Sequence, residues 1–154
     1  MNDTKFEARN PDYEAITRDG FSRHGLMTHL GVEMATVEPG FVELRADYRP
    51  ELTQQHGYFR GGLMGAMADT ACGYAAFSLT PPGATVLTVE YKMNMTAPGE
   101  GEQLMARGWV KRPGRTLIVT HGDVFVIKDD IETLCATMLQ TIMVMLGSGS
   151  RPAG

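Results

Sequence analysis

The sequence has few of the cysteines and histidines from which metal and redox sites are usually built, and it lacks the common nucleotide-binding motifs. Its two cysteines, Cys72 and Cys135, lie in separate apolar runs without a C-x-x-C pair, and its four histidines show no ligand spacing. It contains no G-x-S-x-G elbow, no P-loop and no G-x-G-x-x-G after a strand. We therefore expect no metal site, and we interpret the cysteines as buried thiols in a reducing compartment.

Basic charge is also scarce, which bears on the partners of the protein. The 14 lysines and arginines are outnumbered by 18 aspartates and glutamates, for a net charge of −4 and a pI near 5.5. A nucleic-acid surface needs a basic face, so this balance argues against a nucleic-acid partner.

Signals for export or membrane insertion are also lacking. The amino-terminal residues have no apolar core and carry acids, which is unlike a signal peptide. Residues 61–79 have about the length of a membrane span, but they are poor in Leu, Ile and Val and are interrupted by Asp69. The sequence therefore predicts a cytoplasmic protein without a membrane partner.

Length and composition indicate a single globular domain. A chain of 154 residues, of which 43% are apolar, is long enough for one core and too short for two. We expect that domain over residues 1–146, with residues 1–10 frayed. Residues 147–154, GSGSRPAG, are expected to form a flexible tail.

The most distinctive stretch runs from residue 54 to residue 79. A polar, glycine-rich loop (54–60) is followed by small and apolar residues with a single charge, Asp69. A helix with so few surface residues is buried on nearly all sides. Because ionising a carboxylate there costs free energy, Asp69 is either a structural acid held by hydrogen bonds or a functional group.

The flanking sequence predicts a sheet around this helix. One or two short helices are expected between residues 13 and 30, with a buried side formed by Ile16, Phe21, Leu26 and Leu30. Strands are expected at 31–37, 41–48, 87–95, 104–111, 116–127 and 134–146. The clearest alternation of apolar and polar residues is in 87–95, where one face is predicted to carry Leu87, Val89, Tyr91, Met93 and Met95. The fold class is thus α+β, with an antiparallel sheet of about six strands, one long central helix and a short amino-terminal helical segment.

A single helix covers only part of one face of such a sheet. The apolar side chains that then need cover from elsewhere include Trp109, Met138, Met143 and Met145. We therefore expect a homo-oligomer, either a dimer or a tetramer.

The motifs resemble the hot-dog fold and, more narrowly, the PaaI-type acyl-CoA thioesterases of that superfamily. Their signature is an Asn, a Gly three positions on, a His-Gly-Gly that opens the helix and an Asp two turns later. The matching positions here are Gln54, Gly57, Arg60-Gly61-Gly62 and Asp69. Thr88 matches a Ser or Thr early in the next strand, and residues 112–116 match a basic-Gly-basic-Thr turn. The resemblance covers about residues 30–146.

The resemblance implies an acyl-CoA thioesterase in which Asp69 is the base or nucleophile. It places Asp69 across a dimer interface from the partner subunit's Gly61, whose N–H stabilises the oxyanion. Gln54 and Thr88 would position water and substrate, with Arg60 in the place of the family's His. Coenzyme A, as part of the substrate and not as a cofactor, would be held by Arg112, Gly114, Arg115, Thr116 and Glu90.

Two departures from the motif leave alternatives open. Gln54 keeps the amide of the family's Asn, but Arg60 is a permanent cation and cannot act as a neutral imidazole. Arg60 therefore gives weight to a non-catalytic acyl-CoA-binding or sensing protein. A hot-dog enoyl-CoA hydratase or dehydratase is the other alternative, although no His follows Asp69 before His121. The acyl group also stays open at this point.

Overall fold

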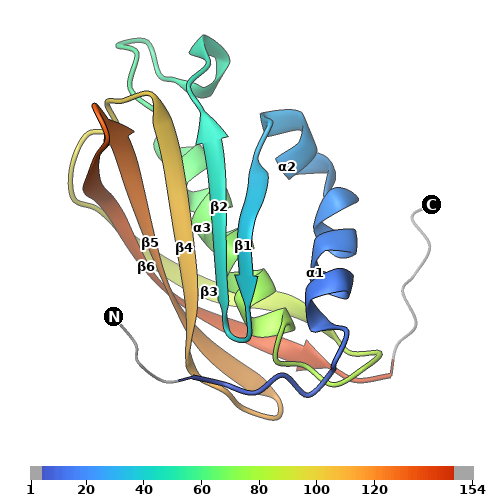
Figure 1. The fold of residues 1–154 in the computed structure, drawn as a ribbon. Coiled ribbons are helices and arrows are strands. Elements are labelled where there is room, and N and C mark those ends of the chain that lie inside the picture. The colour runs from blue at the N-terminus through green and yellow to red at the C-terminus, as the bar shows by residue number, and fades with distance from the viewer. Residues whose placement is uncertain (1–4, 148–154) are drawn as a thin grey trace.

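The apolar run forms a central helix, and an antiparallel sheet curls around it (Figure 1). This computed structural model describes residues 5–147. The helices are α1 Tyr13–Ser22, α2 Gly25–Leu30, the 3-10 helix η1 Pro50–Leu52 and α3 Gly61–Phe77. The strands are β1 Glu33–Glu38, β2 Phe41–Asp47, β3 Thr85–Met95, β4 Gln103–Arg112, β5 Leu117–Lys128 and β6 Ile131–Met145. The six strands follow the order β1-β2-β4-β5-β6-β3, which confirms the predicted fold class.

Small residues let α3 pack directly against the backbone of the sheet. A Cβ at Gly108 of β4 would lie 2.5 Å from the Ala71 carbonyl carbon, and one at Gly122 of β5 would lie 2.8 Å from Cys72 Sγ. Ten of the 17 residues of α3 are buried, which explains why the helix carries so little charge. Among residues 5–147, no helix has the length and apolarity needed to cross a membrane.

Two tight turns shift the observed strand ends from the predicted ones. Gly31 caps α2 with a φ of 68°, so β1 begins at Glu33 and not at residue 31. Asp129 and Asp130 have φ values of 50° and 61°, as in the two-residue hairpin turns whose twist matches that of the strands. As a result, β6 begins at residue 131 and not at residue 134.

The edge strand β3 contains a bulge that changes which of its side chains share a face. Its register with β6 shifts between Thr88 and Glu90, so Val89 is an extra residue in the pairing. Thr88 and Tyr91 both face α3 as a result, and Leu87 lies on the opposite face from Tyr91. The prediction of one continuous apolar face is therefore wrong, because alternation in a sequence does not reveal a one-residue insertion.

The helices α1 and α2 lie beside β1 (Figure 1). The inward stripe of α1 consists of Tyr13, Thr17 and Phe21, which are spaced four residues apart. Ile16 and Leu26 were predicted to be buried, but they are 40% and 51% exposed. Ile16 lies one position off the inward stripe of α1. Because α2 is a separate helix, its buried side does not continue the spacing of α1, and a single pattern drawn through both helices assigns Ile16 and Leu26 to the buried side incorrectly.

Residues 5–10, expected to be frayed, are in part packed onto the domain. Phe6 packs against the hydrophobic core, and Asn10 is buried. The prediction of fraying is wrong for this part of the segment. Residues 1–4 and 148–154, and with them most of the predicted tail, lie outside the described residues.

Candidate functional site

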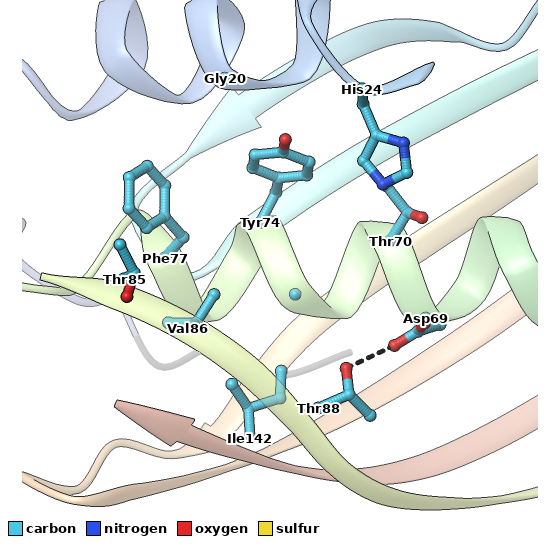
Figure 2. A pocket seen from close by; sticks show the side chains of 11 residues that line it. Gly20, His24, Asp69, Thr70, Tyr74, Phe77, Thr85, Val86, Thr88 and Ile142 are labelled. Carbon is cyan, nitrogen blue, oxygen red and sulfur yellow. Dashed lines mark hydrogen bonds between the residues drawn. The ribbon is translucent and has the colours of Figure 1, made fainter. Parts of the chain in front are cut away.

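Asp69, the only charge of α3, is held by hydrogen bonds from two strands. The Thr88 hydroxyl of β3 donates to Asp69 Oδ1 at 2.7 Å, and Gln140 Nε2 of β6 donates to the same oxygen. Gln140 Nε2 also donates to Thr88 Oγ1 at 2.8 Å. Figure 2 shows the Thr88 side chain directed at Asp69. We call Asp69, Thr88 and Gln140 the Asp69 triangle. Within residues 5–147, no hydrogen-bond donor to the other carboxylate oxygen of Asp69, Oδ2, is found.

Gln140 is missing from the site that the sequence predicts, although its side chain is completely buried. The strand register places it between Thr120 of β5 and Tyr91 of β3. Its neighbours on the inner face of β6, Met138 and Ile142, are apolar and buried. A lone amide in an inward-facing apolar series is the signal that could have identified it.

A cavity of about 310 Å³ opens beside Asp69, between α3, β3 and the amino-terminal helices (Figure 2). The wall beyond Asp69 is mostly apolar and includes Gly73, Tyr74, Phe77, Val86 and Ile142. Burial raises the pKa of the Tyr74 hydroxyl, so this group stays neutral at physiological pH. The cavity is therefore suited to an apolar group attached to a reactive centre at Asp69.

His24 is a second cavity residue that the sequence did not single out as a candidate. Its Nδ1 accepts a hydrogen bond from the Met27 N–H at 3.4 Å and so caps the start of α2. His24 lines the same cavity as Asp69 and Thr70 of α3 (Figure 2). The fold thus brings an imidazole from the amino-terminal segment to the cavity that Asp69 also lines, which sequence spacing alone does not show.

The predicted oxyanion group lies at the other end of the site, where α3 begins. Arg60 precedes the helix in an extended conformation, with φ −69° and ψ 136°, so the Gly61 N–H in the first turn has no acceptor within the helix. Eight residues at 1.5 Å each separate Gly61 from Asp69 by about 12 Å along the helix axis. Groups this far apart cannot act on one thioester carbon. A single chain therefore does not assemble the predicted catalytic pair.

Gln54 and Arg60 flank the start of α3 and not Asp69. Gln54 forms a tight turn, in which its Oε1 accepts from the His56 N–H and its backbone carbonyl accepts from the Gly57 N–H at 3.0 Å. The Arg60 side chain is exposed, and it makes no ion pair or capping bond with any described residue. Its guanidinium is available to an anionic ligand at the helix start.

The basic turn connects β4 with β5 and projects from the sheet. Arg112, Arg115 and Thr116 are exposed there. Gly114 permits the turn to close, because a Cβ at this position would lie 2.0 Å from the Leu117 carbonyl oxygen. Within residues 5–147, none of these residues forms a hydrogen bond with a member of the Asp69 triangle.

Glu90, the remaining predicted contact to coenzyme A, lies on the other face of the sheet from Asp69. It pairs with Thr141, the residue next to Gln140 on β6. Because successive side chains of a strand point to opposite faces, Glu90 faces away from α3 while Gln140 faces it. A single chain therefore does not bring Glu90 to the cavity.

The buried cysteines do not supply a nucleophile. Burial, with a smaller contribution from the Asp69 charge, raises the pKa of the Cys72 thiol to about 12. Burial also raises the pKa of the Cys135 thiol to about 11. Such thiols carry almost no thiolate at neutral pH. In residues 5–147, no group of three or more His, Cys, Asp or Glu side chains is arranged to hold a metal ion.

Known proteins share this architecture. The sequence profile of the Thioesterase superfamily matches residues 56–133, about half of the chain. A crystal structure of a thioesterase family protein from Silicibacter pomeroyi is 44% identical, with a TM-score of 0.86, and the match covers 88% of this chain and 99% of that one. The chain belongs to the thioesterase superfamily.

Other similarities agree with membership of the thioesterase superfamily. A Halobacterium salinarum protein, named only provisionally as an esterase, is 32% identical over 123 residues, which make up 77% of this chain and 80% of that protein. The PaaI protein of Escherichia coli is 17% identical, with a TM-score of 0.79 and coverage of 92% and 99%. At that identity the likeness shows the fold alone. The hot-dog fold and the family predicted from the motifs are confirmed.

Proposed function

We propose that this thioesterase-superfamily protein hydrolyses acyl-CoA thioesters to a free acid and coenzyme A. The observation that carries the proposal is the fixed carboxylate of Asp69 at the edge of a mostly apolar cavity. Hydrolysis needs a carboxylate that activates water or attacks the thioester carbonyl. Since Asp69 Oδ1 accepts the hydrogen bonds from both Thr88 and Gln140, Oδ2 is the oxygen left to act as base or nucleophile.

The direct test is thiol release from a panel of acyl-CoA esters, followed with a chromogenic disulfide reagent. The panel should span acetyl, branched, aromatic and medium-chain acyl groups, because the cavity walls alone do not select among them. Release of coenzyme A from at least one ester supports the proposal. Tight binding of acyl-CoA without thiol release would instead favour the non-catalytic acyl-CoA-binding protein, to which the exposed Arg60 lends weight.

A second copy of the chain is needed to stabilise the oxyanion. Within one chain Gly61 and Asp69 are separated by about 12 Å along the helix axis, so the partner subunit's Gly61 is the donor that would reach the same carbonyl. The edge strand β3 offers unpaired backbone groups for this pairing, and Leu87, Val89 and Tyr91 along it are 59%, 52% and 48% exposed. Antiparallel pairing of two β3 edges would satisfy their free backbone groups and bring these side chains beside those of the partner strand.

The acyl group would occupy the cavity beyond Asp69. Gly73 lies one helical turn after Asp69 on α3 and lines this cavity. A Cβ at Gly73 would meet no atom within 4 Å, so the glycine leaves open space where a larger residue would stand. Gly73 therefore sets the room available to the acyl chain.

Gly73→Leu should shorten the acyl site without harming the fold. We expect kcat/KM for a dodecanoyl ester to fall by about 100-fold, because roughly three or four methylenes lose their buried contacts. The value for acetyl-CoA should stay within about twofold, and Gly73→Ala should fall between the parent and Gly73→Leu. Replacing a helical glycine favours the helix, so a loss of stability would not explain the result. A uniform loss across all chain lengths would place the acyl site elsewhere.

The phosphates of coenzyme A would contact the basic turn. Replacing Arg112 and Arg115 together with Gln should raise KM by about fivefold and leave kcat unchanged, because exposed cations bind ground state and transition state alike. The effect should shrink at high salt, since the interaction is screened. A matched control replaces two exposed arginines, Arg18 of α1 and Arg23 just after its carboxyl end, with Gln and should leave KM unchanged. A lowered kcat with an unchanged KM would contradict this placement.

One observation keeps a hydratase as a second candidate. Hot-dog hydratases pair an acid with an imidazole, and the structure places His24 in the same cavity as Asp69. Addition of water to an enoyl-CoA would be seen as loss of the conjugated thioester absorbance without release of thiol. That outcome, together with an inactive thioesterase assay, would favour the hydratase.

A further inference from the structure

We propose that Gln140 is a positioning residue, which holds Asp69 in the orientation that the reaction needs. The inference rests on the proposed function, since it assigns a role in the same hydrolysis. Gln140 comes from β6, far in sequence from the motif that carries Asp69, and its amide reaches the carboxylate through the inner face of the sheet.

The first argument is the geometry of the Asp69 triangle. Gln140 Nε2 donates to Asp69 Oδ1 and to Thr88 Oγ1, and the Thr88 hydroxyl donates in turn to Asp69 Oδ1. Both donors thus converge on one carboxylate oxygen and fix the rotation of the group. The opposite amide orientation would turn Gln140 Oε1 toward the Asp69 carboxylate, and two acceptors would then face each other.

The second argument is that Gln140 is a poor choice for stability. Its side chain is completely buried, and its Oε1 has no hydrogen-bond partner in the described part of the chain. A buried oxygen without a donor costs free energy, whereas the flanking inward positions Met138 and Ile142 are apolar and carry no such cost. An amide that weakens the core and yet organises the carboxylate is expected where function, and not folding, determines the residue.

The test is Gln140→Met, which keeps the length and approximate volume of the side chain. The variant removes both donated hydrogen bonds together with the unpartnered oxygen. We expect kcat for the best acyl-CoA ester to fall about 10- to 100-fold, because a loosely held carboxylate spends less time in the reactive geometry. KM should stay within about twofold, and the melting temperature should stay equal or rise.

A matched control is Thr120→Val. Thr120 is completely buried beside Gln140 on the neighbouring strand, and its hydroxyl contacts the Gln140 backbone carbonyl at 3.4 Å and not Asp69. This variant should leave kcat within about twofold of the parent. It therefore separates loss of any buried polar group from loss of the amide that holds the carboxylate.

The outcomes separate this inference from the function on which it rests. A parent protein that releases no thiol from any ester overturns the proposed function and this inference with it. An active parent with an equally active Gln140→Met variant overturns the inference alone. So does a Gln140→Met variant that melts at a lower temperature or fails to fold, because the amide would then serve the structure. A lower kcat with an unchanged KM and an undiminished melting temperature supports the positioning role.

Discussion

Asp69→Asn is expected to lower kcat for thioester hydrolysis by about 10³-fold, the loss typical of removing a general base or nucleophile. The structure explains why the substitution should remove the carboxylate without disturbing its surroundings. Both donors of the Asp69 triangle converge on Oδ1, so the Asn carbonyl can take that position and keep the two hydrogen bonds. The Asn amide nitrogen then stands in the place of Oδ2, the proposed base or nucleophile, and it can neither take a proton nor attack a carbonyl.

The measurement compares kcat from thiol release with acyl-CoA affinity from calorimetry. Affinity should change by less than about threefold, since the carboxylate contributes to the transition state more than to the ground state. Asp123→Asn is the matched control, because Asp123 is a partly buried acid that binds His121 and Thr137 and does not contact Asp69. That variant should keep parental kcat. If Asp69→Asn hydrolyses the ester panel as fast as the parent, Asp69 is a structural acid and the mechanism is wrong.

The central part of the fold could be predicted because its local signals agree with one another. The small residues of the run 61–77 cannot form a surface helix, and the turn residues around it leave strands on both sides. The errors in assigning side chains to faces arise where a local sequence pattern is compatible with two arrangements. One extra residue, Val89, turns the two ends of β3 to different faces, and Ile16 lies one position off the buried stripe of α1.

The site was only partly predictable for a different reason. Asp69 could be found from sequence because a charge in an apolar helix conflicts with its surroundings, and Thr88 was found through the motif. The sequence contains Gln140 and His24 as well, but their positions near Asp69 depend on strand register and on how the amino-terminal helices dock. The family motif also does not show that Gly61 and Asp69 of one chain are separated by about 12 Å along the helix axis.

Gly61→Pro is the second substitution with a large expected effect, because it deletes only the N–H that we propose as the oxyanion donor. Proline is favoured in the first turn of a helix, where its missing N–H has no helical acceptor. Arg60 already has the extended conformation that a residue before proline requires, and a Cβ at position 61 would approach only the flexible end of Met95, at 3.1 Å. We expect kcat to fall about 10²- to 10³-fold. Gly61→Ala adds the same Cβ but keeps the N–H, so it should retain most of the activity.

Mixing the two inactive variants tests whether the site is shared between chains. In a dimer of one Asp69→Asn chain and one Gly61→Pro chain, one of the two shared sites combines an intact Asp69 with an intact Gly61. Random co-assembly at equal amounts makes half of the dimers mixed, so about a quarter of the parental activity should return.

A site built within one chain predicts the opposite result, because every chain in the mixture would then carry one defect and no activity would return. The reverse mixture, parent with a chain that carries both substitutions, sharpens the distinction. If the site is shared, each mixed dimer loses both of its sites and about a quarter of the activity remains, whereas independent chains would keep about half. The separation of Gly61 from Asp69 along α3 requires the shared arrangement if both residues act on one thioester, so these two mixtures test the central geometric claim of the mechanism.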